Sequence, residues 1–366
     1  MVILTAATFG FGPASALHAT LSANPGRLGQ DDLVVLPDQL LPLFDDLPTL
    51  PLIAGDANSV AALCASLREP PDVANFGNLD LLLLGLHSRR HVLIDCVGWL
   101  TPKLLRSLEL PPSQRFEHVV EYFPPTNPEH LPSGAKLAQP ALPLPPPQET
   151  RTQSNHVVIC LGGGCFPGQQ TYTTGLERVA ENLASALTHD IPSVDVYVTG
   201  GAAGFVSGAS QAVPLAHGRH LDLIRTSRLV ITVPGLYTLF ECWRLRVPVL
   251  LLPPTNYTQL VQFYCYLTHG LVHPLTQWQN LLDLPPADAD VGHSSAEASI
   301  TRSLRQLLNS PGSTAVVSEK SFTAASGVLR NGAAPLYSRA TALFLDKFCR
   351  TDLPSIGDLI WRSCGY

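Results

Sequence analysis

The chain has 366 residues, of which 45% are hydrophobic and 14% charged, and its formal net charge is −6. A chain of this length and composition can form about two domains, each with a core of its own. Its slightly acidic balance excludes the basic surface with which proteins bind nucleic acid or anionic lipid, so we expect a small-molecule partner.

The eight cysteines form no CxxC pair, and several lie inside apolar runs, which is typical of free thiols in a reducing cytoplasm. The stretch before Arg27 is uncharged, but it lacks the basic start of a signal peptide, and Gly10, Gly12 and Pro13 interrupt it. The leucine-rich run 81–86 is far shorter than the roughly 20 residues of a membrane helix. We therefore expect a cytoplasmic protein without a membrane span.

The first half of the chain alternates apolar strands with helices. It opens with a strand over 2–7, the GFGP turn at 10–13 and an apolar helix over about 14–23. A glycine turn lets a ligand approach the backbone, but the GxGxxG fingerprint fails at Ser15, and a tight turn without a ligand explains the pattern equally well. Further strands are expected at 32–36, 50–54, 91–95 and 116–123, and helices at 59–67 and 78–87.

The strand at 91–95 ends in a carboxylate, Asp95, followed by Cys96-Val97-Gly98-Trp99. Ligands of open α/β sheets bind beyond the carboxyl ends of the strands, so Asp95 is well placed for chemistry. An aspartate that caps a helix is the commoner explanation of such a residue.

Prolines recur over residues 124–155 and indicate a stiff, extended linker without regular structure. A second α/β half then begins with a strand over 156–161, the glycine turn at 162–164, an amphipathic helix with apolar positions 176, 179, 180, 183 and 187, and a strand over 194–199. The predicted division is therefore an N-terminal domain 1–123, the linker 124–155, a C-terminal domain 156–335 and a helical segment 336–366. Helices are also expected at 220–227, 263–269, 300–308 and 336–348.

The central stretch 229–262 indicates a strand, a Pro-Gly turn, a helix from Leu236 to about Arg246, a strand at 249–252 and a polar loop. The first N–H groups of that helix, with the positive end of its dipole, lie beyond the carboxyl end of a strand and predict an anion site. Thr238 and Glu241 are three residues apart and so share one helix face.

These features together resemble the GT-B glycosyltransferases, an α/β class in which two Rossmann-like domains face each other across a cleft. The path from VVICLGGG through VYVTGG to TVPGLYTLFE and LLPPTNYTQ, within about 156–275, resembles the nucleotide-sugar domain of UDP-sugar transferases, including the lipid II-forming N-acetylglucosaminyltransferases. The first half is similar only in its pattern. The resemblance implies a donor site in the second half and an acceptor site in the first.

The resemblance implies that the donor diphosphate rests on the glycine loop and on the helix N-terminus, at Gly163, Gly164, Gly235, Leu236, Tyr237 and Thr238. It further implies that Glu241 binds the ribose and that Asn256 and Gln259 bind the donor sugar, while His217 is expected near the donor base. A diphosphate held by backbone N–H groups needs few lysines, and none occurs between residues 137 and 319. Considered alone, Glu241 would be interpreted as a solvated helical glutamate.

Many sugar-transferring relatives place a histidine as general base in the first glycine loop, which here has none. We interpret Asp95 as the better candidate for the base and His18, one turn into the following helix, as the next; His118 and Glu121 are weaker alternatives. The acceptor side is expected to include Gly10, Phe11, Gly12 and Trp99.

Other constellations are less specific. Asp288-Ala289-Asp290 resembles a metal-holding DxD but lies in a proline-bounded loop, and the pairs His217/His220 and His269/His273 lack a cysteine or carboxylate at ligand spacing. A pyridoxal phosphorylase would need a lysine for its Schiff base, and none lies between residues 137 and 319. We therefore expect a hexosyltransferase, with no metal or other cofactor, that moves a sugar from a UDP-sugar to a small molecule. The alternatives are a nucleotide-sugar hydrolase or epimerase, or a non-catalytic nucleotide-sugar-binding protein.

Overall fold

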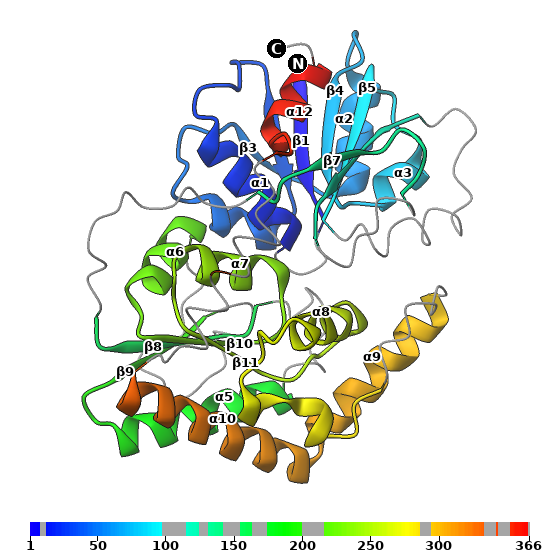
Figure 1. Cartoon of the computed structure of the whole chain (residues 1–366). Coiled ribbons are helices and arrows are strands. Elements are labelled where there is room, and N and C mark those ends of the chain that lie inside the picture. Colours follow the sequence, from blue (N-terminus) through cyan, green and yellow to red (C-terminus); the bar gives the residue numbers. More distant parts are fainter. Residues whose placement is uncertain are drawn as a thin grey trace. The chain divides into compact units, whose positions relative to one another are not determined.

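The computed structural model describes residues 1–7, 12–96, 115–123, 131–141, 154–162, 174–199, 216–285, 294–332, 342 and 352–364. The chain divides into two compact units, Met1–Leu144 with Asp346–Tyr366, and Pro145–Leu345. Each unit has a parallel sheet with flanking helices, so the predicted α/β class is confirmed (Figure 1). None of the described helices is long and apolar enough to cross a membrane.

The sheet of the first unit has the order β3-β2-β1-β4-β5-β6-β7, and every neighbouring pair is parallel. The chain order reverses between β1 and β4, which is where open α/β sheets place their ligand crevice. The strands are β1 Val2–Ala6, β2 Leu33–Leu36, β3 Leu52–Ala54, β4 Asp72–Phe76, β5 Arg90–Asp95, β6 Glu117–Glu121 and β7 Lys136–Ala138. The described helices are α1 Gly12–Ala23, α2 Ala57–Ser66, α3 Asp80–Leu84, the 3-10 helix η1 Asp38–Phe44 and α12 Ile356–Cys364.

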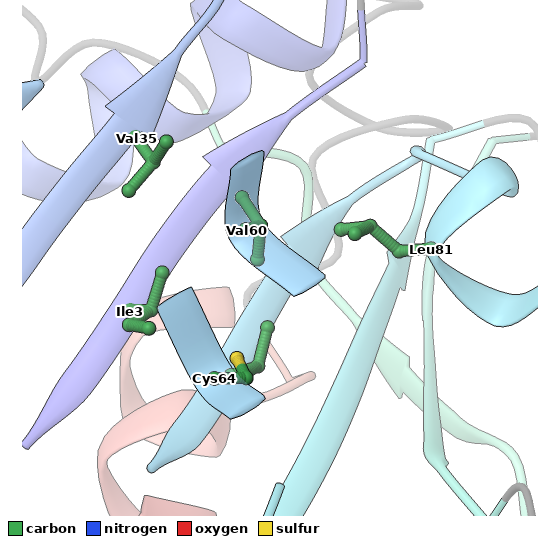
Figure 2. Packing of buried hydrophobic residues seen from close by; sticks show 6 residues of the cluster. Ile3, Val35, Val60, Cys64 and Leu81 are labelled. Carbon is green, nitrogen blue, oxygen red and sulfur yellow. The ribbon is translucent and has the colours of Figure 1, made fainter. Parts of the chain in front are cut away.

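The core of the first unit forms where α2 and α3 cover the sheet. In α2, Val60 and Cys64 are four residues apart and therefore share one face, which packs against Ile3 of β1 and Val35 of β2 (Figure 2). Leu81 of α3 belongs to the same buried cluster. Burying aliphatic side chains of this kind stabilises a fold by about 1.5–3 kcal/mol each, so the cluster holds the helices over the strands.

Two strands of the first unit differ from expectation. Strand β4 was not predicted, because Asp72 and Asn75 interrupt its apolar pattern; both side chains are nevertheless buried. Strand β7 lies in the proline-rich interval that was expected to lack regular structure, and for its residues that prediction is wrong. Among the strands that the structure describes, β7 is an edge strand with one neighbour, where nearby prolines cost no ladder hydrogen bonds.

The C-terminal residues 352–364 return to the first unit. The backbone N–H of Gln139 donates to Pro354 O at 3.0 Å, and Gln139 forms a parallel bridge with Ser355. The hydroxyl of Ser363 donates to Glu117 Oε1 at 2.9 Å. Helix α12 thus packs beside β5 and β6.

The sheet of the second unit has the parallel order β11-β10-β8-β9. Helices α6 and α7 lie on one face, and α5 and α10 lie on the other (Figure 1). The strands are β8 His156–Cys160, β9 Asp195–Thr199, β10 Leu229–Thr232 and β11 Val249–Leu251. The described helices are α5 Thr174–Asp190, α6 His217–Thr226, α7 Leu236–Arg244, α8 Tyr257–Thr268, α9 Ser294–Asn309, α10 Pro311–Asn331 and the 3-10 helices η4 Pro274–Thr276 and η5 Trp278–Asn280.

Helix α10 was not predicted, although its start carries a capping signal. The Ser310 hydroxyl accepts a hydrogen bond from Ser313 N at 3.2 Å, and Pro311 occupies the first helical position, where its missing N–H costs nothing. Its many small and hydroxylated residues weakened the apolar periodicity. Of the helix predicted at 336–348, all but residue 342 lie outside the described residues.

Two helical glycines offer a matched stability test. A Cβ on Gly175 of α5 would lie 2.3 Å from the Leu308 carbonyl oxygen of α9, whereas a Cβ on Gly327 of α10 would meet nothing within 4 Å. Gly175→Ala should lower the free energy of unfolding by about 1–3 kcal/mol through overpacking. Gly327→Ala should raise it by about 0.5–1 kcal/mol, because alanine is the better helix former. Chemical denaturation measures both, and a gain for Gly175→Ala would contradict the close approach of α5 to α9.

Burial of His91 predicts a pH dependence of stability. The side chain is buried in β5, its Nε2 lies 3.3 Å from Asn75 Nδ2, and burial lowers its pKa from 6.5 to about 4. The folded chain therefore keeps His91 neutral, while the unfolded chain protonates it below about pH 6.5. The contribution of neutral, buried His91 to the free energy of unfolding is fully present above pH 6.5 and is lost as the pH falls towards 4.

By linkage, the loss attributable to His91 should reach roughly 2–3 kcal/mol at pH 4. His91→Gln removes the titrating group and should flatten the decline by that amount. Denaturation of both proteins between pH 4 and pH 8 measures the difference. Parallel pH profiles would show that His91 is not buried in its neutral form.

Candidate active site

Helix α7 begins directly beyond the carboxyl end of β10, as predicted. Gly235 is its N-cap residue and forms no side-chain cap hydrogen bond, so no cap side chain competes for the backbone N–H groups of Leu236, Tyr237 and Thr238. The N-terminus of a helix attracts anions through its N–H groups and its dipole. The local geometry at this edge of the sheet therefore suits a phosphate or another anionic group.

Glu241 lies one turn further along α7 and contacts His217, the first residue of α6. Glu241 Oε1 is 3.1 Å from His217 Nε2, and the two side chains are only 2% and 5% exposed. The solvated helical glutamate considered from the sequence is therefore wrong. A buried carboxylate is costly unless it is paired, and here the imidazole next to it supplies the partner.

A second pair, which sequence analysis missed, joins Cys160 at the end of β8 to His220 of α6. Burial acts to raise the pKa of Cys160, but several groups around the sulfur, His220 foremost, together lower that pKa from 9.0 to about 7. Burial acts to lower the pKa of His220, and Cys160 together with Glu241 raises it above 6.5. The sulfur is 4.0 Å from the Thr238 hydroxyl in the first turn of α7.

Helices α6 and α7 lie beside each other near the ends of β8 and β10 (Figure 1). This arrangement brings together five side chains, those of Cys160, His217, His220, Thr238 and Glu241. In the sequence, the signal for Cys160 was its position near the end of an apolar run, two residues before a glycine turn. The signal for His220 was its spacing of three from His217, which had been weighed only as a metal pair.

Asn256 is the last residue of the loop after β11, as predicted, but Gln259 lies within α8, so the prediction is wrong for Gln259. Asn256 is the N-cap of α8, and its side-chain oxygen accepts from Gln259 N at 2.9 Å. The side-chain oxygen of Gln259 accepts from the backbone N–H and the hydroxyl of Thr255, both at 2.8 Å. These oxygens fix the entry into α8, which begins six residues earlier than the predicted start at residue 263 because of this cap. A role of either residue in binding the donor sugar stays a prediction.

In the first unit, Asp95 ends β5 and contacts His118 of β6. His118 Nε2 is 3.0 Å from Asp95 Oδ2, and both side chains are buried. Within the described ranges, the other ring nitrogen of His118, Nδ1, has no hydrogen-bond partner. If Nε2 carries the proton, His118 donates to the carboxylate and orients it.

The other base candidates have structural partners. His18 is buried in α1, with Nε2 2.9 Å from Asp46 Oδ1 and Nδ1 3.3 Å from the Ser22 hydroxyl, and its ring packs against Phe44. Glu121 Oε1 accepts from the backbone N–H of Ala141 at 2.8 Å. Asp95 is likewise paired, with His118, and the choice of Asp95 as the general base stays a prediction.

Of the residues predicted for the acceptor side, Gly12 is the first residue of α1. The following residues lie outside the described part of the chain: Gly10, Phe11, Trp99, Gly163, Gly164 and the Asp288-Ala289-Asp290 motif.

The histidines weighed as metal ligands at the end of α8 have protein partners instead. His269 Nδ1 is 2.8 Å from the Cys265 carbonyl oxygen, and His273 Nδ1 accepts from Leu275 N at 3.2 Å. In the parts of the chain that the structure describes, no group of three or more histidine, cysteine, aspartate or glutamate side chains could hold a metal ion.

Comparison with protein-family models and with curated proteins finds no match. Among solved structures, the chain is similar to the spinosyn rhamnosyltransferase SpnG, with 18% identity over 99% of both chains and a TM-score of 0.46. It is similar to the calicheamicin glycosyltransferase CalG4, with 16% identity over 91% of this chain and 99% of that chain and a TM-score of 0.43. Medicago truncatula UGT71G1 complexed with UDP-glucose has 12% identity over 100% and 98% of the two chains and a TM-score of 0.45.

Proposed function

We propose that the protein is a metal-independent glycosyltransferase, of the hexosyltransferase class, that moves a sugar from a UDP-sugar to a small-molecule acceptor. The observation that carries this proposal is the start of α7 beyond β10, with the buried Glu241 one turn away and held by His217 at 3.1 Å. An anion site and a fixed carboxylate on one helix are the two groups that a ribose joined to a diphosphate requires.

In the proposed complex, the diphosphate accepts hydrogen bonds from the first N–H groups of α7 and from the Thr238 hydroxyl. Glu241, three residues on, lies on the same helix face and accepts hydrogen bonds from the ribose hydroxyls. His217 contacts that carboxylate and keeps it in place. Both side chains are already buried, so they lose little further conformational freedom when the nucleotide binds.

Metal independence follows from what would stabilise the leaving group. When the bond between the sugar and the phosphate oxygen breaks, negative charge grows on the diphosphate. The helix dipole and oriented N–H groups of α7 stabilise that charge without reorganisation, as an oxyanion hole does. The second half of the chain needs no lysine between residues 137 and 319 for this purpose.

The acceptor requires a base, and we assign that role to Asp95. Its carboxylate takes the proton from the acceptor hydroxyl as the acceptor oxygen attacks the anomeric carbon, and His118 holds it at 3.0 Å. A single displacement of this kind would invert the anomeric centre. The uncharged loop 10–13 suits a compact acceptor better than a polymer.

A non-catalytic nucleotide-sugar-binding protein is the second candidate, and one observation favours it. The GFGP turn at 10–13 contains no histidine, which many sugar-transferring relatives place in that loop. Hydrolysis or epimerisation of the nucleotide sugar would use the same donor site with water or an internal base.

A turnover assay separates these functions. The protein is incubated with a panel of nucleotide sugars, with and without candidate small-molecule acceptors, and free nucleotide is measured in the presence and absence of EDTA. We expect release that depends on the acceptor, is greatest with UDP-sugars and is unaffected by EDTA. Asp95→Asn should reduce that release by a factor on the order of 100 or more while nucleotide affinity stays the same.

Other outcomes of this assay contradict the proposal. Release with water alone indicates a hydrolase, and binding without any turnover indicates the non-catalytic protein. Loss of turnover in EDTA, restored by a divalent cation, would show that a metal takes part.

Glu241→Ala should weaken binding of UDP by about 1–3 kcal/mol, because the ribose loses charge-assisted hydrogen bonds. Glu241→Gln keeps the size of the side chain and removes its charge, so it should weaken binding in the same direction if the alanine variant is unstable. Glu319→Ala, at an exposed position of α10, is the matched control and should leave affinity unchanged. Calorimetry measures all three, and unchanged affinity in a folded Glu241 variant would contradict the assignment.

A further inference from the structure

The side-chain oxygen of Gln262 in α8 is buried without a hydrogen-bond donor. The residue is 3% exposed, and within the described ranges its Oε1 accepts no hydrogen bond. Native proteins pair nearly all of their buried polar atoms, because an acceptor without a donor loses the hydrogen bond that it made to water. The unused oxygen of Gln262 therefore indicates a place for a donor that the described part of the chain does not supply.

Neighbouring side chains on α8 show which way this amide faces. Gln262 lies three residues after Gln259 and four before Tyr266, so the three side chains share one face of the helix. The Tyr266 hydroxyl donates to the carbonyl oxygen of Gly235, the N-cap of α7, at 3.4 Å. Helical side chains lean towards the N-terminus of their helix, and α8 begins just beyond β11, at the carboxyl edge of the sheet. The Gln262 amide thus faces the start of α7 and lies nearer to the sheet edge than Tyr266.

The two amides that the resemblance assigns to the donor sugar already use their side-chain oxygens. Asn256 Oδ1 accepts from Gln259 N, and Gln259 Oε1 accepts from the backbone N–H and the hydroxyl of Thr255. Gln262 differs from both, because its oxygen has no bond to any described residue. The oxygens of Asn256 and Gln259 hold the entry into α8, whereas the oxygen of Gln262 is available to a ligand.

The chemistry of an amide narrows the ligand group that can pair with it. A carbonyl oxygen needs a donor, which a sugar hydroxyl has and an ionised diphosphate lacks. In the proposed complex, the ribose lies at Glu241, the phosphates lie at residues 236–238, and the sugar follows beyond Gly235. Because Gln262 faces Gly235, it lies at the sugar end of that order.

We propose that Gln262 is a specificity-determining residue that binds a hydroxyl group of the donor sugar. Its Oε1 accepts the hydroxyl proton, and its amide nitrogen donates to a hydroxyl oxygen of the same sugar. The inference rests on the proposed function, which supplies the nucleotide sugar. It predicts discrimination against a sugar that is deoxygenated at the contacted carbon, because such a sugar leaves the amide oxygen buried without a donor.

The test compares the binding of UDP with that of UDP-glucose, UDP-galactose and UDP-N-acetylglucosamine to the full-length protein by calorimetry. Gln262→Met replaces the amide with an apolar side chain of similar length. It should weaken binding of the preferred UDP-sugar about tenfold and leave UDP binding unchanged, because only the sugar loses a partner. Gln306→Met, at an exposed position of α9, is the matched control and should change neither affinity.

Chemical denaturation of the same variants separates ligand binding from a role in the fold. The free energy of unfolding should not fall in Gln262→Met, because the amide oxygen makes no described bond that the substitution removes. If the methionine variant does not fold, Gln262→Asn keeps the amide but shortens its reach, and it should show the same selective loss of UDP-sugar binding.

Equal weakening of UDP and UDP-sugar binding would place Gln262 at the nucleoside and overturn the proposal. Unchanged affinity for both ligands, or a loss of stability without a selective loss of sugar binding, would overturn it as well. In each of these cases the wild-type protein still binds UDP, so the proposed function stands. If the wild-type protein binds neither UDP nor any of the UDP-sugars, the proposed function itself is wrong and the role of Gln262 falls with it.

Discussion

The candidate site depends on one constraint, a carboxylate that is buried and must be paired. Glu241 is 2% exposed and lies 3.1 Å from His217 Nε2, so the contact ties α7 to α6. Removing His217 would take one close neighbour from a buried carboxylate, which is costly. The pair therefore holds the two helices, and with them the first turn of α7, at the carboxyl edge of the second sheet.

The parallel sheet explains why these groups converge. All four strands of the second unit run in one direction, so their carboxyl ends share an edge, and each following turn or helix starts there. Cys160 ends β8, Thr199 ends β9, and α7 follows β10. In the first unit the same logic places Asp95 at the end of β5. Both parallel sheets thus bring polar groups to the edge at which ligands of such folds bind.

The sequence predicted the α/β class, most of the strands and the start of α7, because continuous apolar runs bounded by Pro-Gly and glycine turns are strong local signals. It missed β4 and α10, in which polar or small residues break the periodicity and long-range packing decides the structure. It also left the Cys160–His220 pair unrecognised, since these residues are 60 positions apart and meet only through the strand and helix order. The role of Glu241 in binding the ribose stays a prediction, and its burial and its contact with His217 could not be derived from local pattern.

A crystal structure of the protein with UDP bound tests the central claim most directly. The account predicts phosphate oxygens within hydrogen-bond distance of the backbone N–H groups of residues 236–238, and the ribose hydroxyls on the carboxylate of Glu241. It also predicts that Glu241 and His217 remain in contact in the complex. A nucleotide bound elsewhere on the chain, or one whose ribose faces away from Glu241, would contradict the account.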